Sequence, residues 1–370
     1  MNIMSDIMIC FAFVSLTVCF SILPFVGRKN LAFGISIPKS EYNNEKIKRI
    51  RRESLYTFLA IGITALLITI FAFRTVPEAK AIGLFTIMVL AQCFAYMSVF
   101  VLKNKKVKQL KKDLEWGKDA KNITVADTNF LTKEKIACSP KWFWIYGLVL
   151  ILTIFLGLYF YDIIPAKIPM QMNLNGDYTR FADKSMISVM YPVFTQLFLG
   201  ALFIFVYYMF KRTPLVIDAE NPTESSKQNA VFRYRWSVFS FLGGLIMLVI
   251  FMMIMLGTIG FLSMVSIFYI SMAGVVLIVA AAIALSITTG QSGSRVKIGK
   301  TKEEKTINRE DDKYWKAGLI YFNREDPAFF VEKRFGIGTT INFARPKAVI
   351  IFLSVIAIAI IASVLSSIFL

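Results

Sequence analysis

Two segments of the chain carry polar side chains in patterns suited to binding chemistry. The first covers residues 165–184 and combines two prolines with amides, carboxylates and a glycine. Prolines hold the backbone extended, and amide and carboxylate groups bind ligands through hydrogen bonds. By its residues alone such a loop is more often a structural connection between two apolar runs, and ligand binding is the alternative. Its candidate residues are Pro165, Pro169, Gln171, Asn173, Asn175, Gly176 and Asp177.

The same loop has a recognisable backbone pattern. Apolar and polar residues alternate over 170–175, which predicts a short strand with one face against the rest of the fold. The run Asn175, Gly176 and Asp177 predicts a tight turn, because these residue types tolerate left-handed backbone angles. The loop is thus expected to have a defined shape.

The second segment covers residues 315–346 and is rich in aromatic residues and glycine. Its pattern predicts an ordered hairpin, with strands at 319–322 and 329–333 and a turn at 323–327. The polar stretch before it, 292–313, is expected to be mobile. We expect the segment to form a cytoplasmic interaction surface. Its candidate residues are Trp315, Tyr321, Asn323, Asp326, Lys333, Arg334 and Asn342.

Basic residues and glycines near the end of this segment also raise the possibility of phosphate binding. Lys333, Arg334 and Arg345 stand close to Gly336 and Gly338. Glycines expose backbone donors, and arginine offers a fork of hydrogen bonds to an anion. The spacing differs from that of a nucleotide-binding loop, however. A structural plug or a contact with lipid headgroups is favoured over nucleotide binding.

Composition argues against several enzyme classes. The 370 residues include no histidine, which removes Ser–His and Cys–His nucleophilic pairs and His-ligated metals. The four cysteines lie far apart and predict neither a disulfide framework nor a zinc site. We expect no catalytic residue, no metal and no cofactor. The chain is interpreted as a protein that is not an enzyme.

Long apolar runs must position the two polar segments. Hydrophobic residues make up 56% of the chain, and about 20 apolar residues let a helix cross a bilayer core. The sequence predicts an all-α, polytopic membrane helix bundle of about eight transmembrane helices. A shaped extracellular loop and a small cytoplasmic hairpin-like segment complete it. The expected spans are 7–26, 55–73, 81–102, 142–161, 187–210, 237–257, 267–288 and 348–370.

Basic residues gather on one side of these runs. Most of the 42 Lys and Arg residues lie in segments 27–54, 103–141, 211–236 and 289–347. The exceptions are Arg74, Lys80, Lys167, Arg180 and Lys184. The positive-inside rule therefore predicts a multi-pass protein of the cell membrane with both termini extracellular. The net charge of +18 then indicates membrane lipids as partners, and no nucleic acid.

Inside the apolar runs the strongest polar groups are Gln92 and Gln196. No Asp, Glu, Lys or Arg accompanies them. Ion-coupled pumps and transporters usually keep ionisable groups near the middle of the membrane. Hydrogen bonds between helices are therefore favoured for both glutamines over a place along a substrate path.

The order of runs and polar segments divides the chain into five parts. Residues 1–141 form a three-span region with basic cytoplasmic segments, and 142–210 form two spans around the Pro/Asn/Gly loop. Residues 211–291 make a two-span hairpin, 292–347 the cytoplasmic segment, and 348–370 the final span.

Both polar segments resemble known families. Pro165, Lys167–Pro169, Asn173, Gly176 and Asp183–Lys184 form a pattern similar to a bacterial membrane domain of unknown function, which SdpI-type immunity proteins share. This resemblance covers 142–210. Gln171 stands where that family commonly has histidine, so proton sensing is not carried over. The pattern from Trp315 to Asn342 resembles a second uncharacterised family. Members resembling both are membrane proteins, largely of Gram-positive bacteria.

The first resemblance implies sensing of membrane-active peptides, immunity to them, or a response to envelope stress. The loop would meet an extracellular peptide ligand, and the helices would pass a shift to a cytoplasmic or membrane protein partner. The alternative is a transporter or export-complex subunit for an apolar or peptide substrate. Gln92 and Gln196 would then line its path.

Overall fold

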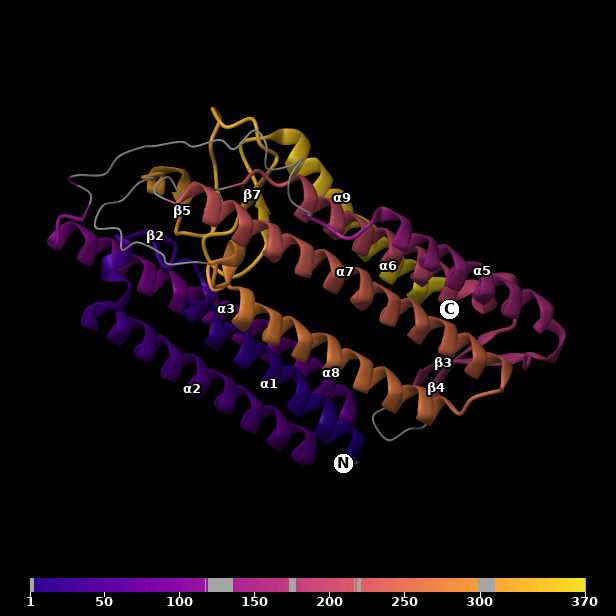
Figure 1. Cartoon of the computed structure of the whole chain (residues 1–370). Helices are drawn as coiled ribbons and strands as arrows, with labels where there is room; N and C mark the ends of the chain where they lie inside the picture. The colour runs from indigo at the N-terminus through magenta and orange to yellow at the C-terminus, as the bar shows by residue number, and fades with distance from the viewer. Residues whose placement is uncertain are drawn as a thin grey trace. The chain divides into compact units, whose positions relative to one another are not determined.

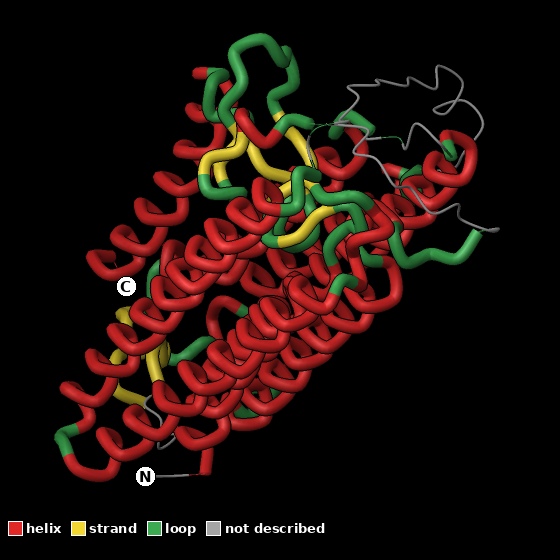
Figure 2. The backbone as a smooth tube through the Cα atoms, turned by 90° about the vertical axis from the view of Figure 1, so that its left-hand side faces the viewer, coloured by secondary structure: helices red, strands yellow, loops and turns green. Residues whose placement is uncertain are grey.

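The computed structural model describes residues 3–116, 118, 136–172, 178–215, 217, 221–298 and 310–369. In these residues the chain forms long helices joined by short helical turns and strand pairs (Figures 1 and 2). The α-helices are α1 (Ile3–Val26), α2 (Glu45–Thr75), α3 (Glu78–Asp113), α5 (Trp144–Tyr159), α6 (Met186–Arg212), α7 (Pro222–Ile259), α8 (Met264–Thr289) and α9 (Pro346–Phe369).

The helices have the length and composition of membrane spans. Among the described residues, seven are long and apolar enough to cross a bilayer, and α9 is a further apolar helix of 24 residues. The predicted all-α membrane bundle is confirmed, and the protein is a multi-pass membrane protein. Helix α3 continues past the predicted end of its span at residue 102. Val107 and Leu110 are buried there, so packing sustains the extra turns.

The strands pair into four antiparallel two-stranded sheets in the described residues. They are β1 (Leu31–Ala32) with β2 (Ile35–Ser36), β3 (Lys167–Met172) with β4 (Tyr178–Asp183), β5 (Trp315–Lys316) with β6 (Ile320–Tyr321), and β7 (Phe330–Glu332) with β8 (Thr339–Ile341). The short 3-10 helices are η1 (Lys39–Asn43), η2 (Pro140–Phe143), η3 (Tyr161–Ile163), η4 (Gln291–Gly293) and η5 (Asp312–Tyr314).

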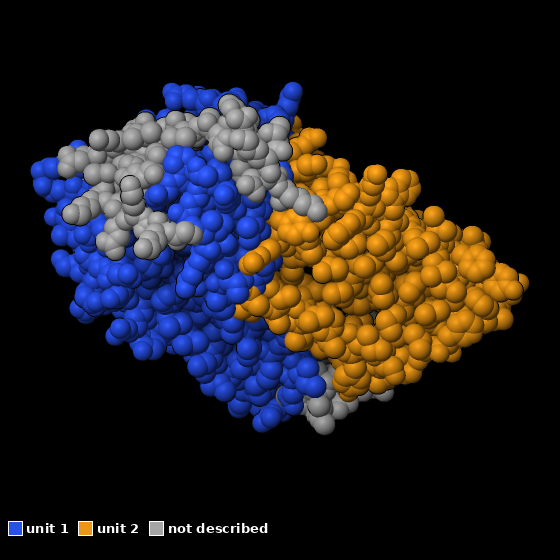
Figure 3. All heavy atoms as spheres, viewed as in Figure 1, with its two compact units in different colours: residues 1–136, 213–233, 285–349 blue, residues 137–212, 234–284, 350–370 orange. Residues whose placement is uncertain are grey.

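The chain divides into two compact units, coloured separately in Figure 3. Unit 1 comprises residues 1–136, 213–233 and 285–349, and unit 2 comprises 137–212, 234–284 and 350–370. Unit 1 contains α1 to α3 and the sheets β1–β2, β5–β6 and β7–β8. Unit 2 contains α5, α6 and the β3–β4 hairpin.

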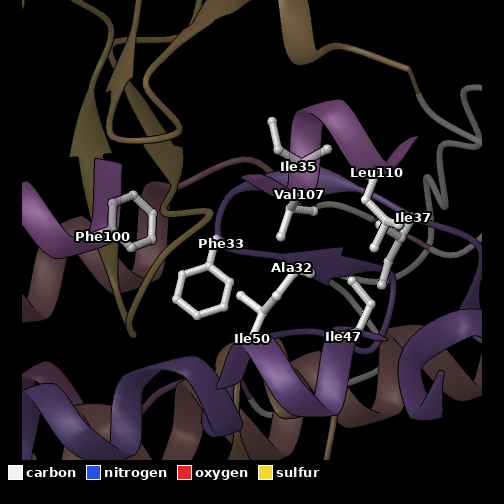
Figure 4. Packing of buried hydrophobic residues seen from close by; sticks show 9 residues of the cluster. All are labelled: Ala32, Phe33, Ile35, Ile37, Ile47, Ile50, Phe100, Val107 and Leu110. Atoms are coloured by element: carbon white, nitrogen blue, oxygen red, sulfur yellow. The ribbon is translucent and has the colours of Figure 1, made fainter. Parts of the chain in front are cut away.

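The core of unit 1 gathers around the hairpin β1–β2 (Figure 4). Phe100 on α3 is fully buried, and its ring lies 5.9 Å from that of Phe33 and 3.9 Å from that of Phe335, centroid to centroid. Aromatic side chains bury a large area and fix their neighbours by ring geometry. Phe100 therefore joins the β1–β2 turn and the loop after β7 to one helix. The buried cluster consists of Ala32, Phe33, Ile35, Ile37, Ile47, Ile50, Phe100, Val107 and Leu110.

Candidate functional sites

The predicted extracellular loop forms the hairpin β3–β4. Ile168 pairs with Ala182 and Pro169 with Phe181, and the register shifts on either side of Gln171. The strand predicted from the alternating pattern over 170–175 is confirmed at residues 170–172, and residues 173–175 lie outside the described residues. Such irregularities bend a hairpin and change which way its side chains point.

One face of this hairpin packs on the helices of unit 2. Ile164, Ile168 and Ala182 are buried, and the first two join a cluster with Val189, Val193, Met255 and Ile259. Val189 and Val193 belong to the first turns of α6. Burial of these apolar side chains holds the hairpin against the helices.

Polar contacts fix the base of the hairpin. Lys184 Nζ donates to the carbonyl oxygens of Asp162 at 3.3 Å and Ile164 at 3.0 Å, and it lies 4.6 Å from the ring centroid of Tyr161. A lysine near carbonyl groups that end a helix satisfies acceptors that the helix leaves open. Ser185 and Ser188 close the start of α6 through reciprocal hydrogen bonds.

Several described residues of the hairpin are exposed. Tyr178 and Phe181 are 42% and 48% exposed, and their ring centroids lie 5.9 Å apart in an edge-to-face arrangement. Lys167 and Asp183 form an exposed ion pair with 2.5 Å between nitrogen and oxygen. Aromatic residues are enriched at surfaces that bind other proteins.

The structure places only part of the predicted ligand-binding set. Pro165 is exposed before β3, and Pro169 is half-buried opposite Phe181. Gln171 pairs with Arg180 through the backbone of the sheet, but its side chain is outside the described part. Asn173, Asn175, Gly176 and Asp177 also lie outside the described residues.

The second polar segment folds differently from the prediction. The expected pairing of 319–322 with 329–333 is wrong: β6 pairs with β5, and β7 pairs with β8. Ala317 and Gly318 have φ of +51° and +72°, which makes a tight turn directly after Trp315–Lys316. Asn323 and Asp326 make local turns through their own side chains instead of a hairpin.

Asn342 organises the core of this segment. Its side chain is fully buried, and its Oδ1 accepts from the backbone N–H groups of Asn323 and Ala344, each at 3.1 Å. Its Nδ2 donates to the carbonyl oxygens of Asn323 at 2.8 Å and Asp326 at 3.1 Å. All four hydrogen-bonding positions of the amide are used. Tyr321 and Asn342 also form an isolated parallel bridge.

Tyr321 extends the same network. Its hydroxyl donates to Asp326 Oδ2 at 2.9 Å and accepts from Asn323 Nδ2 at 3.1 Å. Burial, the largest cause, raises the pKa of Tyr321 to about 12, and the carboxylate of Asp326 acts in the same direction. The hydroxyl therefore remains a donor at neutral pH. Four of the predicted interaction residues thus contact one another.

A buried ionic cluster holds the start of the segment. Arg334 pairs with Asp311 and Asp312, and its guanidinium carbon lies 5.4 Å from the ring of Trp315. Lys111, at the end of α3, pairs with Asp312 at 2.8 Å and Glu310 at 2.5 Å. Residues 310–313 belong to the stretch expected to be mobile, yet these ion pairs tie them to α3 and Arg334. Sequence reasoning missed the acidic residues because the partners are distant in sequence.

The pKa values in this cluster follow from burial and charge. Burial alone would raise the pKa of Asp312, but the charge of Arg334 and the hydrogen bonds from Lys111 and Arg334 lower it to about 2. Glu310 behaves in the opposite way: burial outweighs its hydrogen bond from Lys111 and raises its pKa. Asp312 is therefore the ionised centre of the cluster.

The predicted phosphate-binding cations are not gathered around an open anion site. Arg334 is engaged by two carboxylates, and Arg345 donates to the carbonyl oxygens of Asp326 at 2.9 Å and Arg324 at 3.1 Å. Lys333 is exposed. Gly338 exchanges two hydrogen bonds with the amide of Gln291, at 3.0 and 2.9 Å. This geometry agrees with the structural plug and gives no support to nucleotide binding.

Both membrane glutamines join helices, as predicted. Gln92 Nε2 donates to Thr17 Oγ1 at 3.0 Å and to the Tyr96 hydroxyl at 2.7 Å, which links α3 to α1. Gln196 Nε2 donates to Thr153 Oγ1 at 3.0 Å and to the Leu248 carbonyl at 2.8 Å, which links α6 to α5 and α7. Polar side chains in this arrangement stabilise helix packing in membranes.

Comparison with known families matches both polar segments. Residues 148–195 match the domain of unknown function DUF1648, and residues 324–349 match DUF5808, a family of unknown function. The first match contains β3–β4 and the α6 residues that pack on it, Val189 and Val193. The second contains Asn342 and Arg334. No curated protein and no solved structure matches the chain. The chain therefore carries two uncharacterised domains, each covering one of the segments singled out by its residues.

Proposed function

We propose that the protein is a non-enzymatic sensor of membrane-active peptides, or an immunity protein against them, at the bacterial cell membrane. The hairpin β3–β4 is the recognition element and faces outside. Its resemblance to SdpI-type immunity proteins supports this role. The observation that carries the proposal is the two-faced hairpin: Ile168 and Ala182 anchor it, while Tyr178 and Phe181 stay exposed.

The chemistry of the exposed face fits a peptide that is itself drawn to membranes. Tyr178 and Phe181 offer apolar ring surface, and Lys167 and Asp183 beside them offer both charges. Aromatic residues dominate the energetics of many peptide-binding surfaces. An amphipathic peptide would bury its apolar side against the two rings.

The packing of the hairpin on α6 could transmit ligand binding to the rest of unit 2. A ligand that shifts Ile168 changes the packing of Val189 and Val193 at the start of α6. Further along α6, Gln196 is bonded to α5 and α7, so a rotation of α6 strains both links. The proposed output is a changed contact with a cytoplasmic or membrane protein partner.

The test is survival of a deletion strain exposed to a panel of membrane-active peptides. The strain would carry wild-type protein, the double variant Y178A/F181A, or the control F155A. Phe155 is also an exposed aromatic residue of unit 2, but it lies on α5 and stacks on Tyr159. We expect wild type and F155A to protect against one peptide class and Y178A/F181A to lose that protection at equal expression.

Equal survival with and without the protein across the whole panel would refute the proposed function. The transport alternative has weaker support, because the amide nitrogens of Gln92 and Gln196 are engaged in contacts between helices.

A further inference from the structure

Arg51 is a buried cation whose bonding is incomplete. The residue is 4% exposed and lies on the first turns of α2. Its Nη1 donates to the carbonyl oxygen of Tyr42 at 3.0 Å, and its guanidinium carbon lies 3.9 Å from the centre of the Tyr42 ring. Nε and Nη2 are both buried and make no hydrogen bond with the described residues.

The two nitrogens without hydrogen bonds, Nε and Nη2, lie on the same edge of the guanidinium group. Nε and Nη2 carry parallel N–H bonds on one edge of the planar guanidinium, which is the edge that binds carboxylate or phosphate with two hydrogen bonds. Burying such donors without an acceptor is costly. The free edge of Arg51 is therefore shaped for an oxyanion.

The neighbouring acidic residues are engaged elsewhere. Glu41 accepts from Asn44 at 2.6 Å, Glu45 pairs with Lys48 at 2.8 Å, and Glu53 pairs with Lys103 at 2.9 Å and Lys106 at 3.0 Å. Within the described residues, no carboxylate balances the charge of Arg51. The counterion must come from outside this set.

A second cation approaches the same region. Arg295 Nη2 donates to the carbonyl oxygen of Phe25 at 2.8 Å, and the hydroxyl of Tyr42 donates to that same oxygen at 3.3 Å. Arg295 is exposed, and its Nη1 donates to the Ile287 carbonyl at 3.1 Å. Arg51 thus contacts Tyr42, and Arg295 shares the Phe25 carbonyl oxygen with Tyr42. Neither arginine is paired with a carboxylate of the described residues.

The position along α2 indicates where an anion would come from. The apolar run of α2 begins at Leu55, one helical turn after Arg51, so Arg51 stands at the edge of the membrane-spanning part. Lipid phosphates occupy that depth of a bilayer, and exposed cations such as Lys46 and Lys48 attract anionic headgroups.

We propose that Arg51 binds a phosphate group through its Nε–Nη2 edge, with Arg295, which shares the Phe25 carbonyl oxygen with Tyr42, as a second positive charge nearby. The phosphate belongs either to an anionic lipid headgroup or to a free phosphate. Tyr42, on η1, covers one face of the guanidinium, and the Nε–Nη2 edge keeps both of its donors for the anion. This inference is independent of the peptide-sensing function.

The test uses the purified full chain in a maltoside detergent. Thermal unfolding is followed while phosphatidylglycerol, a glycolipid with the same acyl chains but no phosphate, or inorganic phosphate is titrated in. The proteins are wild type, R51K, R51Q, R295Q and the control R52Q. Arg52 neighbours Arg51 in sequence but is exposed. R51K keeps the positive charge but removes the pair of parallel N–H donors.

We expect phosphatidylglycerol to raise the unfolding temperature of wild type and R52Q by several degrees more than the glycolipid does. R51K and R51Q should bind at least about tenfold more weakly, and R295Q should be weakened less. Stabilisation by inorganic phosphate at millimolar concentration, without a preference for phosphatidylglycerol over the glycolipid, would assign the site to a soluble phosphate.

A wild-type measurement keeps the test independent of variant folding. Hydrogen exchange of residues 39–55 should slow when either phosphate probe binds, since η1 and the start of α2 close over the anion. Unchanged exchange and unchanged unfolding temperature with both phosphate probes would overturn the proposal. Equal responses of R51Q and wild type would overturn it as well.

Discussion

Gly34 and Gly318 touch through their backbones at the tips of two hairpins in unit 1. A Cβ atom added to Gly34 would lie 2.7 Å from the Cα atom of Gly318, closer than two carbon atoms can approach without repulsion. Both residues have left-handed backbone angles, with φ of +80° and +72°. Asn104 donates to the carbonyl of Phe33 at 2.6 Å beside the contact. The turns of β1–β2 and β5–β6 therefore need glycine for conformation and for space.

Replacing either glycine with alanine should destabilise unit 1. The left-handed angle alone costs an L-residue about 1–2 kcal/mol, and the backbone contact adds to it. We expect G34A and G318A to lower the unfolding temperature in detergent by several degrees, in line with a loss of this size. The control is G83A on α3, where an added Cβ meets nothing within 4 Å. A G34A protein as stable as G83A would contradict the contact.

Asp312 should make the free energy of unfolding depend on pH in the acid range. Its folded pKa of about 2 lies below its ordinary value of 3.8, so its contribution is present above pH 4 and is lost as the pH falls towards 2. D312N should lower the free energy of unfolding at neutral pH by about 2 kcal/mol and flatten the decline below pH 4. Unfolding curves between pH 2 and 7 measure both effects.

Glu310 should affect the pH dependence of the free energy of unfolding in the direction opposite to that of Asp312. Its pKa is raised by burial, so its contribution is present below the ordinary value of 4.5 and is lost as the pH rises through the folded value. E310Q should therefore lose less stability at neutral pH than D312N does. The control D113N changes an exposed carboxylate of α3 that accepts from Gln109. A neutral-pH loss in E310Q as large as in D312N would contradict the assignment.

Asn342 should not tolerate aspartate. N342D keeps the shape of the side chain but places an oxygen where Nδ2 now donates to the carbonyls of Asn323 and Asp326. Leaving these acceptors unpaired beside a buried charge should cost about 3 kcal/mol or more. Limited proteolysis of residues 315–346 and thermal unfolding detect the loss. N43D, a change at an exposed asparagine, should leave both measurements unchanged.

The membrane glutamines should act on packing. Q92L and Q196L each remove bonds between helices, and such bonds contribute about 0.6–2 kcal/mol in membrane proteins. We expect lowered unfolding temperatures with normal insertion, measured against T86V, which alters an exposed hydroxyl of α3 bonded within its own helix. Unchanged stability in both leucine variants would contradict this assignment.

Local chemistry of the sequence determined much of the architecture. Apolar runs long enough to cross a bilayer give helices, because no other open backbone arrangement satisfies its own hydrogen bonds in lipid. The alternation over 170–175 predicted a strand that overlaps β3 at residues 170–172. Gln92 and Gln196 were predicted to bond between helices because an isolated amide in hydrocarbon is costly. Each of these conclusions depends on neighbours in sequence or on the solvent alone.

Tertiary structure alone decided which distant residues meet. The hairpin expected between 319–322 and 329–333 did not form, because Ala317–Gly318 supplies a tighter turn and Asn342 holds the Asn323 loop from far along the chain. Likewise, Arg334 finds Asp311 and Asp312, whereas Arg51 keeps a free edge. The sequence gives the net charge and the secondary-structure propensity of each segment. Which side chains and strands pair depends on distances that only the folded chain sets.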